Sequence, residues 1–163
     1  MEDPTPFLNG PYAEGSWQSR LMLVVEDSDD DYFLLTRAFR KAGIFNPVRR
    51  VENGKQAISY LEEGAPYADR TAFPFPYLVL LDLKMPILHG FGVLDWARGR
   101  EETKLLPFLI FSSSSQDIDV KDSYLKGANG YVTKSTSLAS LTNVVAAIHS
   151  YWLKVNQVKE LLC

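Results

Sequence analysis

Five polar residues follow apolar runs that are typical of buried strands. Glu26 and Asp27 follow "LMLVV", Asp82 follows "YLVLL", Ser112 follows "PFLIF", and Lys134 closes "GYVTK". If these runs form parallel strands, the polar residues meet at one edge of the sheet. Three carboxylates held together repel one another, so they need a counter-charge. A hard divalent cation with oxygen ligands fits that need, and Lys134 supplies one fixed positive charge.

Each of these residues also has an ordinary structural explanation. Acidic residues at a helix N-terminus are favourable with the helix dipole, and Asp82 could be a turn residue before a proline. Serines often cap helices, and Lys134 could be a solvated surface lysine. The combination favours a site, because every member falls at the same end of its own strand. His89 and His149 lack the partner spacing of a transition-metal site.

Five strand-like runs alternate with five segments of helical periodicity. The expected strands span residues 21–25, 47–51, 77–81, 107–111 and 130–134. The expected helices lie between about 28–43, 53–64, 91–100, 117–126 and 138–158. This alternation predicts an α/β fold with a parallel sheet covered on both faces. The expected arrangement is doubly wound and flavodoxin-like, with strand order 2-1-3-4-5 and a ligand crevice at the carboxyl ends of the strands.

Local signals predict several helix ends. Ser28 with Asp31 resembles a capping box, Asn53 is a helix cap, and the run Ser112 to Ser115 is expected to cap the helix at 117–126. Gly127 is expected to end that helix.

Composition limits the class of protein. The 163 residues suit one domain, and 17 basic against 20 acidic residues give a net charge of −3. This charge provides no basis for binding nucleic acid or an anionic membrane. The only cysteine is Cys163, no apolar run approaches the ~18 residues of a membrane span, and the N-terminus does not resemble a signal peptide. A cytoplasmic location is therefore expected.

Four motifs together resemble the receiver domains of bacterial two-component response regulators: "LVVEDSDDD", "LVLLDLKMPILHG", "LPFLIFSS" and "GANGYVTK". The resemblance covers about Leu21 to Leu153. It implies a tail at 1–20, a receiver domain at 21–153 and a helical extension at 154–163, with no output domain attached. The long segment "EEGAPYADRTAFPFPY" makes the chain most similar to single-domain regulators that partner phytochrome-type histidine kinases.

The resemblance implies the role of each metal-site residue. Asp82 would accept a phosphoryl group from a sensor histidine kinase. Asp27 and Asp82 would bind Mg²⁺ directly, Glu26 would hold it through water, and the backbone carbonyl of Lys84 would complete the protein ligands. The protein would therefore be a phosphoacceptor rather than an enzyme, apart from phosphotransfer to itself and self-dephosphorylation.

The resemblance also implies a switch. Lys134 would pair with the phosphoryl oxygens, Ser112 would be the switch hydroxyl, and Tyr131 the aromatic residue that changes rotamer with it. The sequence departs from the family at three positions. Ser135 follows the lysine where proline is usual, which leaves open whether the bond between them is cis. His89 stands where Asp is frequent, and Ser113 where a small apolar residue is common.

Two alternatives to a phosphoacceptor remain open. One is a receiver-like binding module that docks partners without phosphorylation. The other is a hydrolase with an aspartyl nucleophile, similar to the haloacid dehalogenase-like phosphatases, although these need an acid where Lys84 stands. The last helix carries a second apolar stripe that predicts a homodimer. Its members are Val144, Ile148, Tyr151, Val155, Val158 and Leu162.

Overall fold

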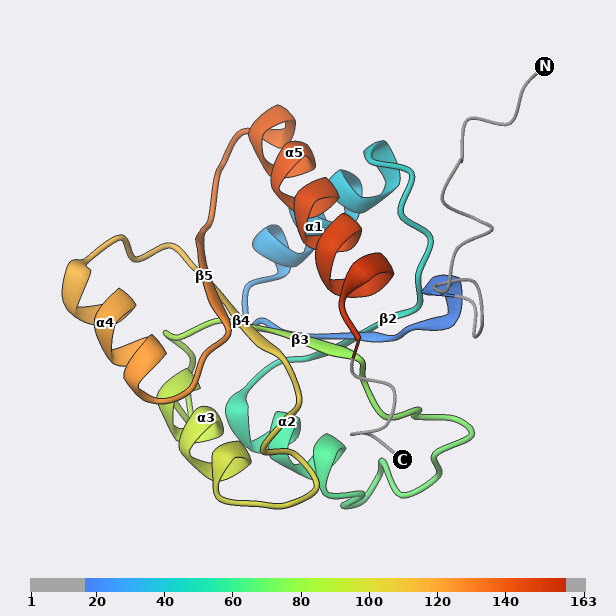
Figure 1. Cartoon of the computed structure of the whole chain (residues 1–163), viewed down its shortest axis with the longest axis vertical. Helices are drawn as coiled ribbons and strands as arrows, with labels where there is room; N and C mark the ends of the chain where they lie inside the picture. The colour runs from blue at the N-terminus through green and yellow to red at the C-terminus, as the bar shows by residue number, and fades with distance from the viewer. Residues whose placement is uncertain (1–16, 158–163) are drawn as a thin grey trace.

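The protein has a five-stranded parallel sheet covered by helices on both faces (Figure 1). The computed structural model describes residues 17–157. The strands are β1 Met22–Val25, β2 Val48–Val51, β3 Leu78–Leu81, β4 Phe108–Ser112 and β5 Gly130–Thr133. The helices are α1 Asp29–Lys41, α2 Gly54–Leu61, α3 Gly90–Arg98, α4 Asp117–Leu125 and α5 Leu138–Ile148. The strand order is β2-β1-β3-β4-β5, so the predicted fold class and topology are confirmed.

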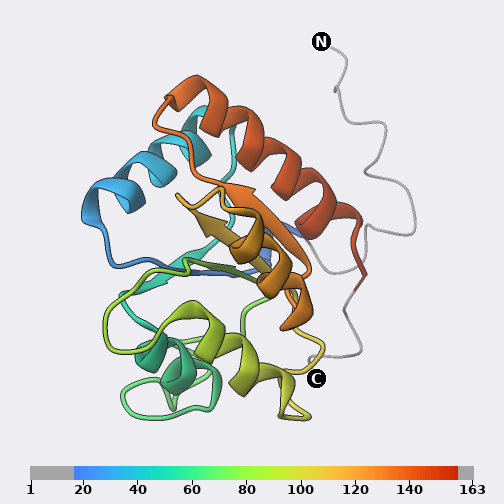
Figure 2. The ribbon, with the colours of Figure 1, turned by 90° about the vertical axis from the view of Figure 1, so that its left-hand side faces the viewer.

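Two apolar cores lie on opposite faces of the sheet. Successive side chains of a strand point to opposite faces, so Leu23 and Val25 enter one core and Met22 and Val24 the other. Helices α2 and α3 cover the first face, and α1 and α5 cover the second, as Figure 2 also shows. All residues of β1 and β3 are buried, which explains why both strands are continuous apolar runs.

The sheet register places the functional residues side by side. Val25 of β1 pairs with both Val51 of β2 and Leu81 of β3. The hydrogen bonding continues one residue further, because the Asp82 N–H donates to the Val25 carbonyl at 3.1 Å. The Lys134 N–H likewise donates to the Ser112 carbonyl at 2.8 Å. Regular sheet structure therefore fixes the backbone at each strand's carboxyl end.

Two predicted helix caps are confirmed and one is wrong. The Ser28 Oγ accepts from the Asp31 N–H at 3.2 Å, and the Asn53 Oδ1 accepts from Gln56 at 2.9 Å. The serine run does not supply the cap of α4. Its N-cap is Gln116, without a side-chain capping bond, while the Ser114 hydroxyl donates to Asp119.

Each helix ends before its predicted last residue, and the difference is largest for α2 and α5. Helix α2 stops at Leu61, before the predicted Gly64. Helix α5 stops at Ile148 and continues as the π-helix η2, His149–Val155, and Asn156 is extended with φ −64° and ψ 135°. The predicted helix to Val158 is therefore wrong at its C-terminal end. None of the described helices is long and apolar enough to cross a membrane.

The segment between α2 and β3 is irregular but well packed. The Arg70 guanidinium donates to the carbonyls of Tyr60 at 2.9 Å and Leu61 at 3.0 Å. The Tyr60 hydroxyl donates to the Pro74 carbonyl at 2.8 Å, and the Tyr60 and Tyr67 rings lie 5.1 Å apart. Aromatic contacts and one arginine therefore hold this long loop against α2.

The first described residues pack beside the end of the last helix. Trp17 lies in the short 3-10 helix η1, Trp17–Ser19, and its ring centroid is 5.2 Å from that of His149. The rest of the predicted tail, residues 1–16, lies outside the described residues.

Candidate functional site

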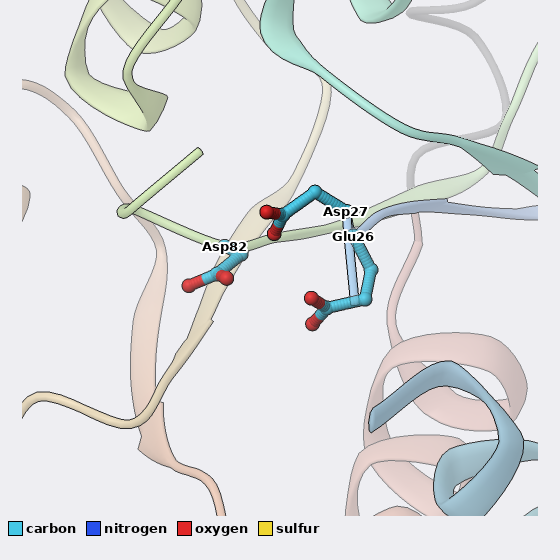
Figure 3. A group of neighbouring side chains, drawn as sticks. All are labelled: Glu26, Asp27 and Asp82. Atoms are coloured by element: carbon cyan, nitrogen blue, oxygen red, sulfur yellow. The ribbon is translucent and has the colours of Figure 1, made fainter. Parts of the chain in front are cut away.

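Three carboxylates meet at the carboxyl edge of β1 and β3 (Figure 3). Glu26, Asp27 and Asp82 each offer one oxygen, and these oxygens all lie within 4.8 Å of one another. Glu26 and Asp82 are buried, whereas Asp27 is exposed. The donor set consists of oxygen atoms and has one solvent-facing side, which fits a hard divalent cation that keeps some of its water.

Lys134 binds the same carboxylates. Its ammonium forms ion pairs with Glu26, with Asp31 at 2.9 Å and with Asp82 at 3.2 Å, while only 10% of the lysine side chain is exposed. Burial by itself would lower the pKa of Lys134, but the hydrogen bonds to Glu26 and Asp31 and the charge of Asp82 raise that pKa well above its usual range. The ammonium is therefore permanently charged.

The cluster contains more carboxylates than positive charges, because Lys134 alone pairs with Glu26, Asp31 and Asp82. Burial raises the pKa of Glu26, against the opposing hydrogen bonds from Lys134 and from the Ser28 N–H. One ammonium is shared among several carboxylates and does not fully compensate this buried one. A divalent cation would supply the missing charge.

The loop after β3 leaves the Asp82 side chain at the edge of the sheet. Its Oδ1 accepts from the Leu83 N–H at 2.7 Å. Leu83 and Met85 are buried in the core, and the side chain of Lys84 between them is exposed. A Cβ added at Gly90 would lie only 2.4 Å from the Asp82 carbonyl oxygen, so the start of α3 passes directly beneath Asp82.

His89 has a clear structural role at the same loop. Its Nδ1 accepts from the Phe91 N–H at 3.2 Å and caps α3. An aspartate performs the same capping task in many helices, so the substitution keeps the local structure.

The two expected switch residues, Ser112 and Tyr131, both contact the backbone of Ser114. The buried Ser112 hydroxyl accepts from the Ser114 N–H at 3.3 Å, and the half-buried Tyr131 hydroxyl donates to the Ser114 carbonyl at 2.8 Å. The side chain of Ser113, between Ser112 and Ser114 in the chain, is exposed. Among the described residues the cis peptide bond is Ala65–Pro66, so the bond between Lys134 and Ser135 is trans.

Sequence reasoning missed two charged residues at this edge. Asp31 was interpreted only as a helix-start residue, yet it contacts Lys134. Arg50 was assigned only to a strand, yet it donates to the carbonyls of Glu26 at 2.9 Å and Asp27 at 3.2 Å. It also pairs with Asp29 at 2.7 Å. An arginine at the end of the strand beside the acidic run was the available signal.

Comparison with known proteins agrees with this geometry. The sequence profile of the response regulator receiver domain matches residues 22–146. Response regulator Rcp1 of Synechocystis sp. is 31% identical over 135 residues, which cover 83% of this chain and 90% of Rcp1. The crystal structure of the Mn²⁺-bound form of Rcp1 has a TM-score of 0.74 and 30% identity, covering 85% of this chain and 97% of that chain.

Two further solved structures are similar over the same part of the chain. The phosphorylated cyanobacterial phytochrome response regulator RcpA has a TM-score of 0.78 and 30% identity, with 85% of this chain and 97% of RcpA covered. RPA3017, a response regulator in red light signaling of R. palustris, has a TM-score of 0.81 and 31% identity, with 85% and 96% covered. Sequence, strand order and the acidic edge agree: the chain belongs to the response regulator receiver domain family of two-component signalling systems.

Proposed function

We propose that the protein accepts a phosphoryl group from a histidine kinase on Asp82, with Mg²⁺ bound beside it. The observation that carries this proposal is the position of Asp82, which lies within 4.8 Å of two further carboxylate oxygens and 3.2 Å from a lysine ammonium. Phosphoryl transfer needs a positioned nucleophile and neutralisation of charge on the transferred oxygens, and this arrangement offers both.

The transfer is a displacement at phosphorus. An Asp82 carboxylate oxygen forms a bond to phosphorus as the bond from phosphorus to the kinase histidine nitrogen breaks, and the electron pair leaves with that nitrogen. Lys134 pairs with the transferred oxygens. Asp27 and Asp82 would hold Mg²⁺ directly, Glu26 through water and Lys84 through its carbonyl. The bound cation would neutralise charge on the phosphoryl group.

The phosphorylated state is expected to rearrange the loop after β4. A phosphoryl group on Asp82 draws the Ser112 hydroxyl and Lys134 toward it. Ser112 then releases the Ser114 N–H. The carbonyl of the same residue, Ser114, accepts from the Tyr131 hydroxyl. The two switch residues are thus coupled through one peptide segment, and the proposed output is a changed surface around α4 and β5.

Intact mass measurement tests the phosphoacceptor proposal. Incubation with acetyl phosphate and Mg²⁺ should add one phosphoryl group, and omission of Mg²⁺ or the change Asp82→Asn should abolish the addition. Asp95→Asn is the matched control, because Asp95 is an exposed carboxylate that pairs with Lys126 on the surface. The absence of any adduct would favour a phosphorylation-independent binding module, and rapid turnover of many phosphate esters would favour a hydrolase.

A phytochrome-type histidine kinase is the proposed donor. The long segment between α2 and β3 and the likeness to RcpA and RPA3017 support this choice. A phosphorylated kinase of that type should transfer its label to this protein at least about tenfold faster than a phosphorylated chemotaxis-type kinase, a difference of ~1.4 kcal/mol in activation free energy. Equal rates with both kinases would contradict the proposed partner.

We also propose a homodimer through the end of the last helix. Tyr151 and Val155 of η2 are 53% and 49% exposed, whereas Ile148 is buried in the core. Val144 is partly buried against the same core, and the last two members of the predicted stripe, Val158 and Leu162, lie outside the described residues. Light scattering should show a dimer for the wild type and a shift toward monomer for Tyr151→Ser with Val155→Ser. The change Phe33→Ser on α1 is the control, because Phe33 is an exposed aromatic residue (63%) away from that end. A wild type that stays monomeric with and without beryllofluoride would contradict the dimer.

A further inference from the structure

Lys134 has one carboxylate partner that does not belong to the acidic cluster. Asp31 lies in the first turn of α1, and its Oδ2 is 2.9 Å from the Lys134 ammonium. The group of carboxylates that could hold a metal ion consists of Glu26, Asp27 and Asp82, without Asp31. Asp31 therefore binds the lysine without being part of the expected cation site.

The three partners of Lys134 differ in what a cation would do to them. An ammonium has three N–H donors, and in this structure Glu26, Asp31 and Asp82 accept from it. A divalent cation at the acidic cluster would draw on Asp82 directly and on Glu26 through water, because it would attract these carboxylates more strongly than an ammonium does. Asp31 is the partner that remains available to Lys134.

The structure of the helix start directs Asp31 toward the lysine. The Ser28 hydroxyl accepts from the Asp31 N–H and fixes the first turn of α1. Of the two preceding acids, Asp29 pairs with Arg50, while the exposed Asp30 side chain makes no ion pair or hydrogen bond within residues 17–157. Only one of the three consecutive aspartates therefore contacts Lys134.

We propose that Asp31 is a positioning residue that holds the Lys134 ammonium next to Asp82 when a cation has taken over Glu26 and Asp82. This inference rests on the proposed phosphoacceptor function. With Asp31 as an anchor, two N–H donors of the lysine are free to meet the incoming phosphoryl oxygens. Asp31 forms no bond to phosphorus and transfers no proton; with acetyl phosphate as donor, Asp82 gains the phosphoryl group and acetate leaves with the electron pair.

The test measures the rate of phosphoryl uptake from acetyl phosphate at saturating Mg²⁺ by intact mass. Asp31→Asn should slow uptake by about 3- to 10-fold, the size expected from loss of one charge-assisted hydrogen bond that positions the Lys134 ammonium. Asp30→Asn is the matched control, with the same change of charge on the same helix turn, and should stay within about 2-fold of the wild type. Asp31→Glu keeps the carboxylate and should recover most of the rate.

A double-mutant cycle separates positioning of Lys134 from a general effect of charge. In a Lys134→Ala background, Asp31→Asn should change the remaining rate by less than about 2-fold, because the group through which Asp31 acts is gone. Equal slowing by the Asp31 and Asp30 changes, or an undiminished Asp31 effect without the lysine, would overturn the inference. A wild type that gains no phosphoryl group would instead overturn the proposed function, and the inference with it.

Discussion

At the scale of single residues, we expect Lys134 to determine how strongly a cation binds the acidic cluster. Its ammonium occupies oxygens of Glu26 and Asp82, two of the three carboxylates that form the candidate cation site. A cation must therefore displace an existing counter-charge as well as shed water. The lysine stabilises the carboxylate cluster, and we expect it to oppose metal binding, because like charges within a few ångströms repel strongly at low effective dielectric.

The change Lys134→Met should therefore tighten Mg²⁺ binding by at least about 5-fold, since it removes a positive charge in contact with the site. Calorimetric titration with Mg²⁺ at neutral pH measures this affinity directly. The same variant should melt at a lower temperature without Mg²⁺, because the buried Glu26 loses its counter-charge.

Lys126→Met provides the control for this change. Lys126 pairs with Asp95 on the surface at 2.8 Å, and its loss should leave Mg²⁺ affinity within about 2-fold. Unchanged or weaker Mg²⁺ binding by Lys134→Met would show that the lysine does not compete with the cation.

The sequence predicts some residues of this edge better than others. Glu26, Asp82, Ser112 and Lys134 were predictable because strand endings and parallel register determine their positions together. Their assigned roles remain proposals. The contact between Asp31 and Lys134 was not predictable, because it joins residues 103 positions apart and depends on the direction of one helical side chain.

At the scale of elements, the turn from β3 into α3 has no room for a larger residue at Gly90. An added Cβ would lie 2.4 Å from the Asp82 carbonyl oxygen and 2.9 Å from the Leu83 Cα, both of them backbone atoms. Backbone cannot move aside as a flexible side chain can. The start of α3 must therefore shift away from Asp82 if the position is filled.

The change Gly90→Ala should lower the free energy of unfolding by about 2 kcal/mol or more, through overpacking against fixed backbone. It should also slow phosphoryl uptake, since the displaced loop carries Asp82 itself. Urea denaturation and the acetyl phosphate assay measure the two effects.

Gly99→Ala is the matched control at the other end of the same helix. An added Cβ there would lie 3.5 Å from the Asp95 carbonyl oxygen, which is ordinary contact. Gly99→Ala should therefore change stability by less than about 1 kcal/mol. Similar losses of stability for Gly90→Ala and Gly99→Ala would contradict the close contact expected between a Gly90 side chain and the backbone of Asp82.

Helix ends show where local patterns are informative. Ser28 and Asn53 cap their helices as predicted, because each has an N–H within reach three residues later. The serine run failed as a cap because the Ser114 hydroxyl donates to Asp119. The end of α5 was not predictable either, since no local signal marks where the helix widens into a π-helix at His149.

At the scale of the whole molecule, residues from three distant parts of the chain meet near the amino ends of β1 and β2. The side-chain amide of Asn46 donates to the carbonyls of Trp17 at 2.6 Å and Arg20 at 3.2 Å. Its oxygen is then free to accept from a ring nitrogen of His149, at 2.9 Å. The alternation of strands and helices predicted the fold class, but these contacts depend on tertiary packing.

His149 makes this junction sensitive to acid. The residue is 7% exposed, and burial, with a smaller contribution from the positive charge of Lys154, lowers the pKa of His149 to about 4. In the unfolded chain the pKa of a histidine is about 6.5. Between these values the unfolded state binds a proton that the folded state excludes, so the free energy of unfolding falls as the pH falls from about 6.5 to about 4.

This linkage should cost about 2 kcal/mol of stability between pH 7 and pH 5. Because carboxylates also titrate in acid, the quantity to compare is the difference in that loss between the wild type and His149→Gln, measured by urea denaturation at both pH values. Glutamine can still donate to Asn46 but takes up no proton. The loss of stability of His149→Gln between pH 7 and pH 5 should therefore be about 2 kcal/mol smaller than that of the wild type. If His149→Gln lost as much stability as the wild type over this range, the acid sensitivity would have to arise elsewhere than at the junction of Trp17, Asn46 and His149.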